Sequence, residues 1–184
     1  MKAPLIFVGG ALTTPRLLLE PLTPAHAPLM FEGFVDPVLY HWVNAEPPTD
    51  VADLQHRFER IANPYAPSGE LWLNWAARLT GGGAYAGLIE ATVRPDRIVF
   101  LAYYVFTAFA RQGFAREACA AVIEHLWRAY DAAEVRADMD FHNVPSRSLV
   151  ESLGFVRRTR NIVTALRGEP SIDYRYRLKR PGSS

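Results

Sequence analysis

The segment from residue 97 to residue 140 restricts the fold more than any other part of this sequence. Residues 97–106 are mainly apolar, aromatic or β-branched, which predicts a strand, and they lead through a turn at 111–113 into a long amphipathic stretch. The helix predicted at 113–130 has a buried stripe of Ala115, Cys119, Val122, Leu126 and Tyr130. A second strand is predicted at 133–140. A helix that joins two strands of one sheet in this way makes them parallel neighbours.

The turn that precedes this helix has the features of an anion-binding site. A helix that starts directly after a strand points its first free N–H groups and the positive end of its dipole outward, and such an end binds phosphate. Gly113 allows a ligand to approach the backbone closely, and Arg111 and Arg116 add positive charge. On its own, the same pattern also fits an ordinary strand, turn and helix with surface arginines.

A second motif lies at residues 141–155, where another helix is expected to begin. Asn143 is a favoured N-cap residue, and Pro145 has no N–H group to leave unpaired in a first turn. Ser146 is then held on a rigid element, and Gly154 supplies the left-handed residue that ends the helix before the next strand. An ordinary capped helix has the same pattern, so this motif alone does not assign a function.

The other segments predict a mixed α/β fold whose sheet is largely antiparallel, with the parallel pair as the exception. Two turns join consecutive strands, at residues 81–83 and 95–96. Residues 63–69 are a loop that contains Pro and Gly. The remaining strands are predicted near 16–22, 71–79, 84–94, 155–163 and 172–178, and the remaining helices near 24–34, 50–62 and 146–153.

Length and composition are those of one soluble domain. The chain has 184 residues, of which 49% are hydrophobic and 21% charged. We therefore expect a single domain over residues 1–184, with residues 1–10 and 180–184 at its periphery. With 20 basic and 19 acidic residues, the net charge of +1 favours neither nucleic acid nor an anionic membrane as a partner.

The cysteine content and the N-terminal residues bear on disulfide bonds, metal binding and cellular location. Cys119 is the only cysteine, which excludes an intramolecular disulfide and a thiolate metal cluster, and its place in the apolar stripe predicts packing rather than reactivity. The apolar run at 4–12 is too short to span a bilayer. We read it as a strand or an arm rather than a signal peptide, and we expect the protein in the cytoplasm.

Together the two motifs resemble those of the GNAT superfamily of acetyl-CoA-dependent N-acetyltransferases, and within it the Rim-type ribosomal-protein (alanine) N-terminal acetyltransferases. The family's pyrophosphate loop, Q/R-x-x-G-x-G/A, falls on residues 110–115, and N-x-x-S followed by an apolar helix and G-F falls on residues 143–155. Ala110 replaces the usual Gln or Arg, and Arg111 stands where this branch usually has Gly. The backbone N–H groups do not need a side chain at 110, and Arg111 is placed to supply the lost contact. The resemblance covers roughly residues 12–180.

The resemblance implies a GNAT-like sheet, flanked by helices, whose central parallel strands splay apart to receive the pantetheine arm of acetyl-CoA. It implies acetyl-CoA as cosubstrate and no metal. Ser146 would lie near the sulfur and stabilise the leaving thiolate, while Asn143 would hold cofactor amides or a water. The cofactor-binding residues implied are Tyr103, Tyr104, Val105, Arg111, Gln112, Gly113, Phe114, Ala115, Arg116, Asn143 and Ser146.

Direct attack of an amine on the thioester also requires a group that accepts the amine's proton. Residues 99–105 contain no acid, so Glu90 on the preceding strand is the best candidate for this catalytic base. The alternative is a strand carboxylate that faces solvent by alternation. Asp138, Asp140 and His142, just before Asn143, compete for the same role.

The acceptor is predicted to be a primary amine, most simply the α-amine of a protein or peptide. A polyamine or aminoglycoside site should contain several convergent carboxylates, and the acidic residues of the first predicted helices are scattered. A small amine remains the alternative acceptor, and Ala110 keeps open a catalytically silent acetyl-CoA-binding regulatory module. A homodimer also stays open. Aromatic residues that would suit an acceptor site are Tyr40, Trp42, Tyr65, Trp72, Trp75, Tyr103 and Tyr104.

Overall fold

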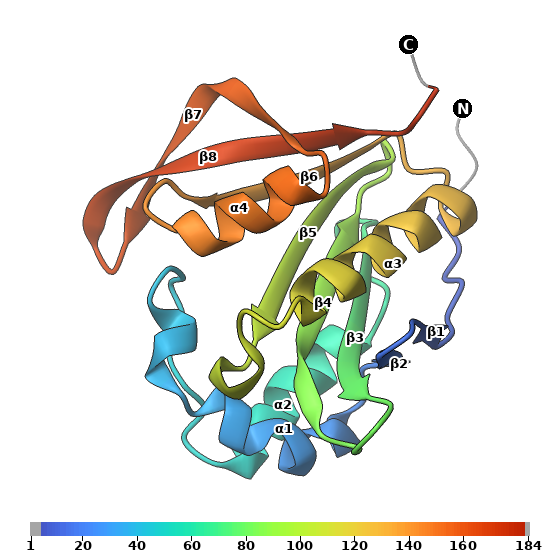
Figure 1. Cartoon of the computed structure of the whole chain (residues 1–184), viewed down its shortest axis with the longest axis vertical. Helices are drawn as coiled ribbons and strands as arrows, with labels where there is room; N and C mark the ends of the chain where they lie inside the picture. Colours follow the sequence, from blue (N-terminus) through green and yellow to red (C-terminus); the bar gives the residue numbers. More distant parts are fainter. Residues whose placement is uncertain (1–4, 183–184) are drawn as a thin grey trace.

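The computed structural model describes residues 5–182 and, within them, all side chains except those of residues 159 and 160. Eight strands form one sheet in the order β1-β2-β3-β4-β5-β6-β8-β7, with helices packed on it (Figure 1). Every neighbouring pair is antiparallel except β5 and β6. The strands are β1 (Leu12–Thr13), β2 (Leu17–Pro21), β3 (Leu71–Leu79), β4 (Tyr85–Val93), β5 (Ile98–Val105), β6 (Glu134–Asp140), β7 (Val156–Leu166) and β8 (Glu169–Lys179).

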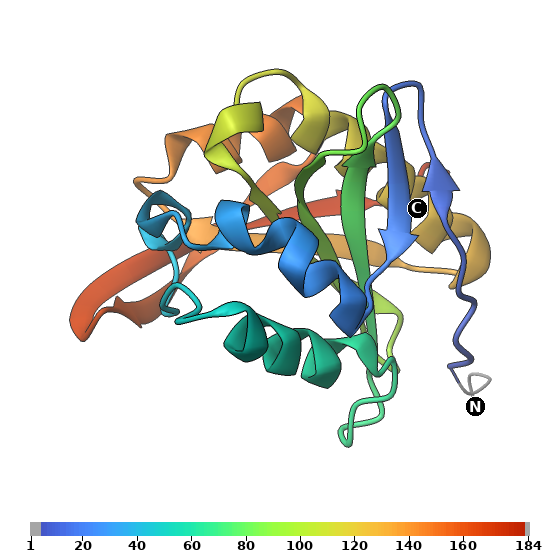
Figure 2. The same cartoon turned by 90° about the horizontal axis from the view of Figure 1, so that it is seen from below.

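The helices cover both faces of the sheet. Figure 2 shows α1 (Ala27–Phe34) and α2 (Val51–Ala62) on one side of the strands and α3 (Phe114–Ala129) on the other. Alternation along β3 makes the separation clear, because Ala77 packs in the core under α3 while its neighbour Ala76 packs in the core under α1 and α2. The fourth helix, α4 (Val144–Ser152), buries Val150 in the core on the α3 side.

The parallel strands β5 and β6 pair over only three residues and then diverge. Ile98, Val99 and Phe100 are in register with residues 134–136, whereas β5 continues beside β4 to Val105 and β6 continues beside β8. Ala102, just past the paired segment, is exposed. This confirms the predicted parallel pair in a largely antiparallel sheet. The splay leaves the end of β5 free of a neighbour on one edge.

A glycine allows β4 and the end of β5 to approach closely at this point. A Cβ atom at Gly87 would overlap the backbone oxygen of Tyr104, and its backbone has a positive φ of 156°. Only glycine accommodates both conditions. The position of Tyr104 and Val105 therefore depends on the absence of a side chain on the neighbouring strand.

Two predicted boundaries were wrong for local reasons. The helix expected at 24–34 is split into a 3-10 turn, η1 (Pro24–His26), and α1, because Pro28 has no N–H group to donate and fits only in the first turn of a new helix. The last hairpin is longer than expected. Arg167 and Gly168, with φ of 53° and 82°, form a tight two-residue turn between β7 and β8.

The N-terminal segment is an arm rather than a long strand. Within its described part, residues 5–11 have no regular structure, and Val8 accepts from and donates to the Tyr130 hydroxyl at 3.0 and 2.9 Å. No helix within residues 5–182 is long and apolar enough to cross a membrane.

Candidate active site

The turn before α3 presents a row of unpaired backbone donors. Arg111 and Gly113 have left-handed φ values of 60° and 82°, and Gly113 is the N-cap of α3 without a side-chain capping bond. Within residues 5–182, no acceptor is bonded to the N–H groups of residues 111–116. Successive N–H groups in such a turn form a concave anion-binding surface, and the helix dipole adds to it.

The side chains of this loop reach backbone carbonyls nearby. Gln112 Nε2 donates to Ala108 O at 3.0 Å, and one Arg116 nitrogen lies 3.5 Å from Ser152 O at the end of α4. Arg111 is exposed and makes no hydrogen bond or ion pair within the described part of the chain. Neither arginine forms an ion pair with a carboxylate among the described residues, so both keep their positive charge beside the loop.

The start of α4 is built as the sequence predicted. Asn143 is the N-cap, and its side-chain oxygen accepts from the backbone N–H of Ser146 at 3.2 Å. The Tyr103 hydroxyl on β5 donates to the backbone oxygen of Ser146 at 3.2 Å. This bond joins β5 to α4, the helix that follows β6. Burial raises the pKa of Tyr103, and a hydrogen bond with the Ser146 side chain lowers it by a smaller amount. The fold thus brings Tyr103, Asn143 and Ser146 together, as the sequence motifs suggested.

Glu90 lies on β4, on the face of the sheet opposite to the one that α4 covers. In register it stands between Asn74 of β3 and Ala102 of β5, and within the described chain its carboxylate has no hydrogen bond or ion pair. Burial raises the pKa of Glu90 to about 7. Burial, and next the charge of Glu90, raises the pKa of Tyr104 to about 12. Glu90 is therefore not on an open surface, and near neutral pH it is poised between its acid and its base form.

The carboxylates that compete with Glu90 are engaged in the structure. Asp140 accepts from Ser171 and, at 2.7 Å, from the backbone N–H of His142. Burial raises the pKa of Asp140, but hydrogen bonds from Ser171 and His142 outweigh that effect and lower it. Asp138 pairs with Arg175 at 2.6 Å. Because its lowered pKa makes Asp140 a weak proton acceptor and Asp138 is engaged by Arg175, Glu90 is favoured as the base.

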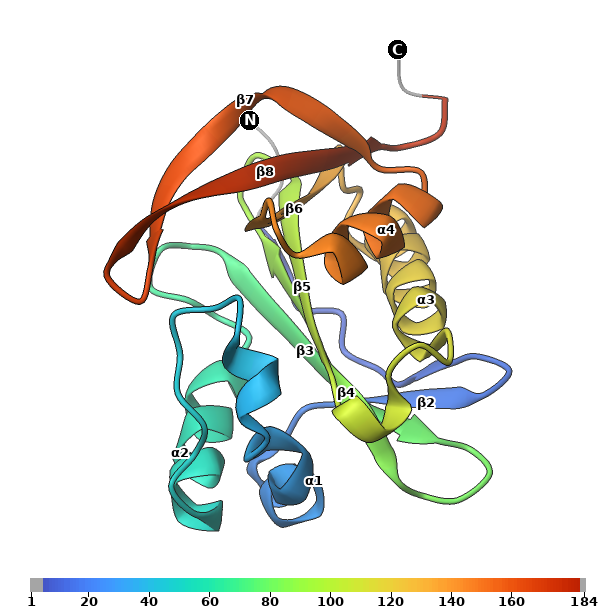
Figure 3. The ribbon, with the colours of Figure 1, turned by 60° about the vertical axis from the view of Figure 1, so that its left-hand side comes forward.

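Beside the start of α4, side chains that the sequence reasoning did not connect make contacts between distant segments of the chain. The His142 ring stacks on Trp42 with centroids 6.2 Å apart, and its Nδ1 lies 3.2 Å from Asp140. Asn44 donates to Ala165 O at 2.5 Å and accepts from the Arg167 N–H at 2.7 Å. Figure 3 shows the tip of the β7–β8 hairpin beside the segment that precedes α2. We refer to residues 40–44 and 165–167 as the side wall.

Not every aromatic residue proposed for an acceptor site is available. Trp75 is buried in the core on the α3 side and donates to Gly10 O at 3.3 Å. Tyr40 is also buried, but its ring lies 6.3 Å from that of Tyr104. Trp42 remains partly exposed beside His142.

Comparison with protein families identifies the chain. A family model described as an acetyltransferase (GNAT) domain matches residues 16–156. The chain belongs to the GNAT acetyltransferase family. It is thus an N-acetyltransferase of a family that uses acetyl-CoA as the acetyl donor. Comparison with curated protein sequences gave no match.

Solved structures agree with this fold at low sequence identity. A ribosomal L7/L12 alpha-N-protein acetyltransferase in complex with coenzyme A superimposes with a TM-score of 0.82 at 14% identity, covering 92% of this chain and 98% of the other. For a ribosomal-protein-S5-alanine acetyltransferase from Vibrio fischeri the values are 0.81 and 12%, covering 96% and 100%. A putative acetyltransferase from T. thermophilus gives 0.78 and 23%, covering 95% and 92%. At these identities the likeness establishes the GNAT fold and not the acceptor.

Proposed function

We propose that this GNAT protein transfers the acetyl group of acetyl-CoA to the α-amine at the N-terminus of a protein or peptide. The observation that carries the acetyl-CoA part of the proposal is the row of N–H groups at residues 111–116, unpaired within the described chain, next to the diverging ends of β5 and β6. A pyrophosphate on these donors leads the pantetheine arm between the strands, where the backbone of residues 103–105 is free on one edge.

The residues of α4 would act on the sulfur side of the reaction. The amine attacks the thioester carbonyl carbon, the C–S bond breaks, and the coenzyme leaves as a thiolate. The Ser146 hydroxyl, which lies beside the Tyr103 side chain at the start of α4, would donate a hydrogen bond to that thiolate. Because the Asn143 oxygen is occupied by the helix cap, its amide NH₂ is the part left for the cofactor or a water.

Glu90 would act on the amine side. As the C–N bond forms, the nitrogen must lose a proton. Glu90 would accept this proton directly or through a water, because a carboxylate with a pKa of about 7 can act as a base near neutral pH. The proton finally returns to the thiolate, so that coenzyme A leaves as a thiol. A terminal α-amine has a pKa of about 7.7–8.0, so roughly a tenth is neutral at pH 7 and little base strength is needed.

Replacing Glu90 by Gln tests the base through its pH dependence. We expect kcat/KM of the wild type to rise with pH through about 7, as Glu90 loses its proton. Glu90→Gln should lower the rate and leave only the titration of the acceptor amine near pH 8. Rates measured from about pH 5.5 to 9, with the exposed Glu32→Gln on α1 as control, decide the matter. Parallel profiles for wild type and Glu90→Gln would remove Glu90 from the mechanism.

The same variant should also change stability with a defined sign. A carboxyl whose folded pKa is raised from 4.5 to about 7 destabilises the fold progressively between those pH values and fully above pH 7. Glu90→Gln should therefore raise the free energy of unfolding at pH 8 by on the order of 1–3 kcal/mol, and by little at pH 4.5. Urea unfolding at both pH values measures this.

One observation keeps a small cationic acceptor as a second candidate. Asp140 and Asp173 face each other on β6 and β8. Burial, followed by the charges of Asp140 and Asp138, raises the pKa of Asp173. Three carboxylates near one another would attract a polyamine or an aminoglycoside. Asp138 and Asp140 already have partners within the protein, however, which leaves little free negative charge for a polycation.

A panel of acceptors separates these possibilities. We expect intact-mass analysis to show one acetyl group on the α-amine of peptides and none on lysine side chains. Peptides with a blocked N-terminus but a free lysine are the matched control. Turnover of spermidine or an aminoglycoside, with every peptide unmodified, would establish the small-amine function instead. Binding of acetyl-CoA without acetylation of any acceptor would indicate a regulatory module.

A further inference from the structure

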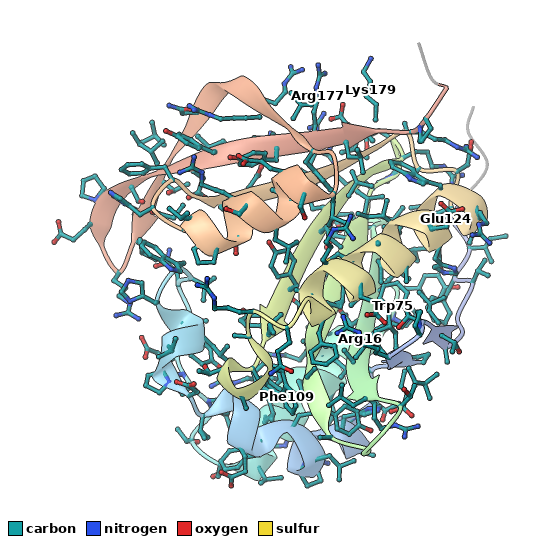
Figure 4. All side chains as sticks on the ribbon, in the orientation of Figure 1. Arg16, Trp75, Phe109, Glu124, Arg177 and Lys179 are labelled. Atoms are coloured by element: carbon teal, nitrogen blue, oxygen red, sulfur yellow. The ribbon has the colours of Figure 1, made fainter. Side chains whose placement is uncertain are left out.

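Arg16, which lies between β1 and β2, is bonded to the loop that precedes α3. Figure 4 shows it beside the first turn of that helix. Its Nη1 donates to Gln112 O at 3.0 Å, and its Nε donates to Glu117 at 2.6 Å. The guanidinium carbon also lies 4.5 Å from the centre of the Phe114 ring. One side chain from the N-terminal strands thus contacts the loop, the first residue of α3 and its first acidic residue.

The carbonyl that Arg16 holds fixes the direction of an unpaired N–H group. Gln112 lies between Arg111 and Gly113, the two residues with left-handed backbone. The peptide bond from Gln112 to Gly113 is planar and trans, so its carbonyl and its N–H group point in opposite directions. Holding Gln112 O on the side of Arg16 therefore aims the Gly113 N–H to the opposite side. The Gly113 N–H is one of the unpaired donors of the loop, so Arg16 holds the loop from the side opposite this donor.

Glu117 holds Arg16 in place, and without Arg16 its negative charge would repel an anion bound at the loop. Its carboxylate accepts from the Thr14 hydroxyl at 2.6 Å and from Arg16 N at 2.8 Å, and its side chain is only 16% exposed. Burial raises the pKa of Glu117, but hydrogen bonds from Thr14 and Arg16 outweigh that effect and lower it. Glu117 is thus a carboxylate in the first turn of α3. Arg16 neutralises a charge that would otherwise repel phosphate there.

We propose that Arg16 is a positioning residue for acetyl-CoA, which fixes the loop at residues 111–113 from the side opposite its N–H groups and neutralises Glu117. The inference rests on the proposed function, because it assumes that the loop holds the pyrophosphate. It assigns to Arg16 no contact with the cofactor. A non-glycine residue such as Arg111 is strained in the left-handed conformation. The hydrogen bonds of Arg16 offset this strain and so keep the loop in its observed shape.

Calorimetric titration with coenzyme A and with pantetheine, which lacks the pyrophosphate, tests the proposal. We expect Arg16→Ala to weaken coenzyme A about tenfold or more and to leave pantetheine unchanged. Arg78→Ala is the matched control, because Arg78 also pairs with a glutamate, Glu20 at 2.9 Å, in the neighbouring strand. It should leave both affinities unchanged. Equal weakening of both ligands in Arg16→Ala would mean general loosening and would overturn the proposal.

A double variant separates positioning from charge. In Arg16→Ala with Glu117→Gln the local charge is neutral again, yet Gln112 O is still unheld. We expect coenzyme A to bind this variant at least about fivefold more weakly than the wild type. Full recovery would overturn the positioning role. Unchanged affinity in Arg16→Ala overturns the inference alone, whereas a wild type that does not bind coenzyme A overturns the proposed function and the inference with it.

Discussion

Gly113→Glu is expected to abolish measurable binding of coenzyme A. Gly113 caps α3 with φ of 82°, a conformation that costs other residues about 1–2 kcal/mol. A Cβ there would lie 3.4 Å from Arg16 Nη2, so the new side chain would crowd the loop and add a carboxylate at the N-cap of α3. Phosphate and carboxylate would then compete for one helix N-terminus. Calorimetry with coenzyme A measures the loss.

A second glycine with a left-handed backbone serves as the control, because its substitution causes similar strain away from the loop. Gly83 also has a left-handed φ, of 72°, and a Cβ at that position has nothing within 4 Å among the described residues. Gly83→Glu should therefore bind coenzyme A as the wild type does. Ala110→Gln, which restores the usual loop residue, should leave affinity intact or improve it. Unchanged affinity in Gly113→Glu would remove the pyrophosphate from this loop.

Ser146→Ala is expected to lower turnover by roughly ten- to a thousandfold with little change in affinity for acetyl-CoA. The hydroxyl gains its interaction only as charge develops on the sulfur, so its loss affects the transition state more than the bound substrate. The substitution spares the helix cap, because the bond to Asn143 comes from the backbone N–H of Ser146. Single-turnover rates and calorimetry give the two quantities separately.

Ser148→Ala on the same helix is the matched control. Ser148 is exposed, and its hydroxyl has no partner among the described residues, so the change should leave both quantities unaltered. If Ser146→Ala lowers affinity as much as it lowers turnover, Ser146 serves binding or folding and not the leaving group.

The local half of the site was predictable from sequence. Asn143 as N-cap, Gly154 with its left-handed φ of 87° and the strand, turn and helix around Gly113 depend on neighbours within a few residues, and the structure confirms them. The buried position of Cys119 follows from helical spacing in the same way and is also confirmed. Backbone chemistry and periodicity act over such short distances. The single domain over residues 1–184 and the cytoplasmic location stay predictions.

The rest of the site depends on contacts between distant segments. Arg16 meets Glu117 across 101 positions, and Ser171 meets Asp140 across 31. Neither pair has a spacing that one helix or strand would impose, so a single sequence does not reveal it. The same holds for Glu90, whose raised pKa comes from the burial that strands on both sides provide. Its place on a strand was predictable, and its environment was not.

The side wall has a consequence for how a newly made chain becomes active. Its three hydrogen bonds join residues 121 to 127 positions apart, from Tyr40 and Asn44 to Ala165 and Arg167. Contacts of such long sequence separation form late, because most of the chain must already be ordered. During synthesis, the strand, loop and helix around Gly113 leave the ribosome well before residue 165 does. In the proposed enzyme, Glu90, Gly113 and Ser146 are thus all made before the hydrogen bonds of the side wall can form, so the fold around the site is complete only after residue 167 has left the ribosome.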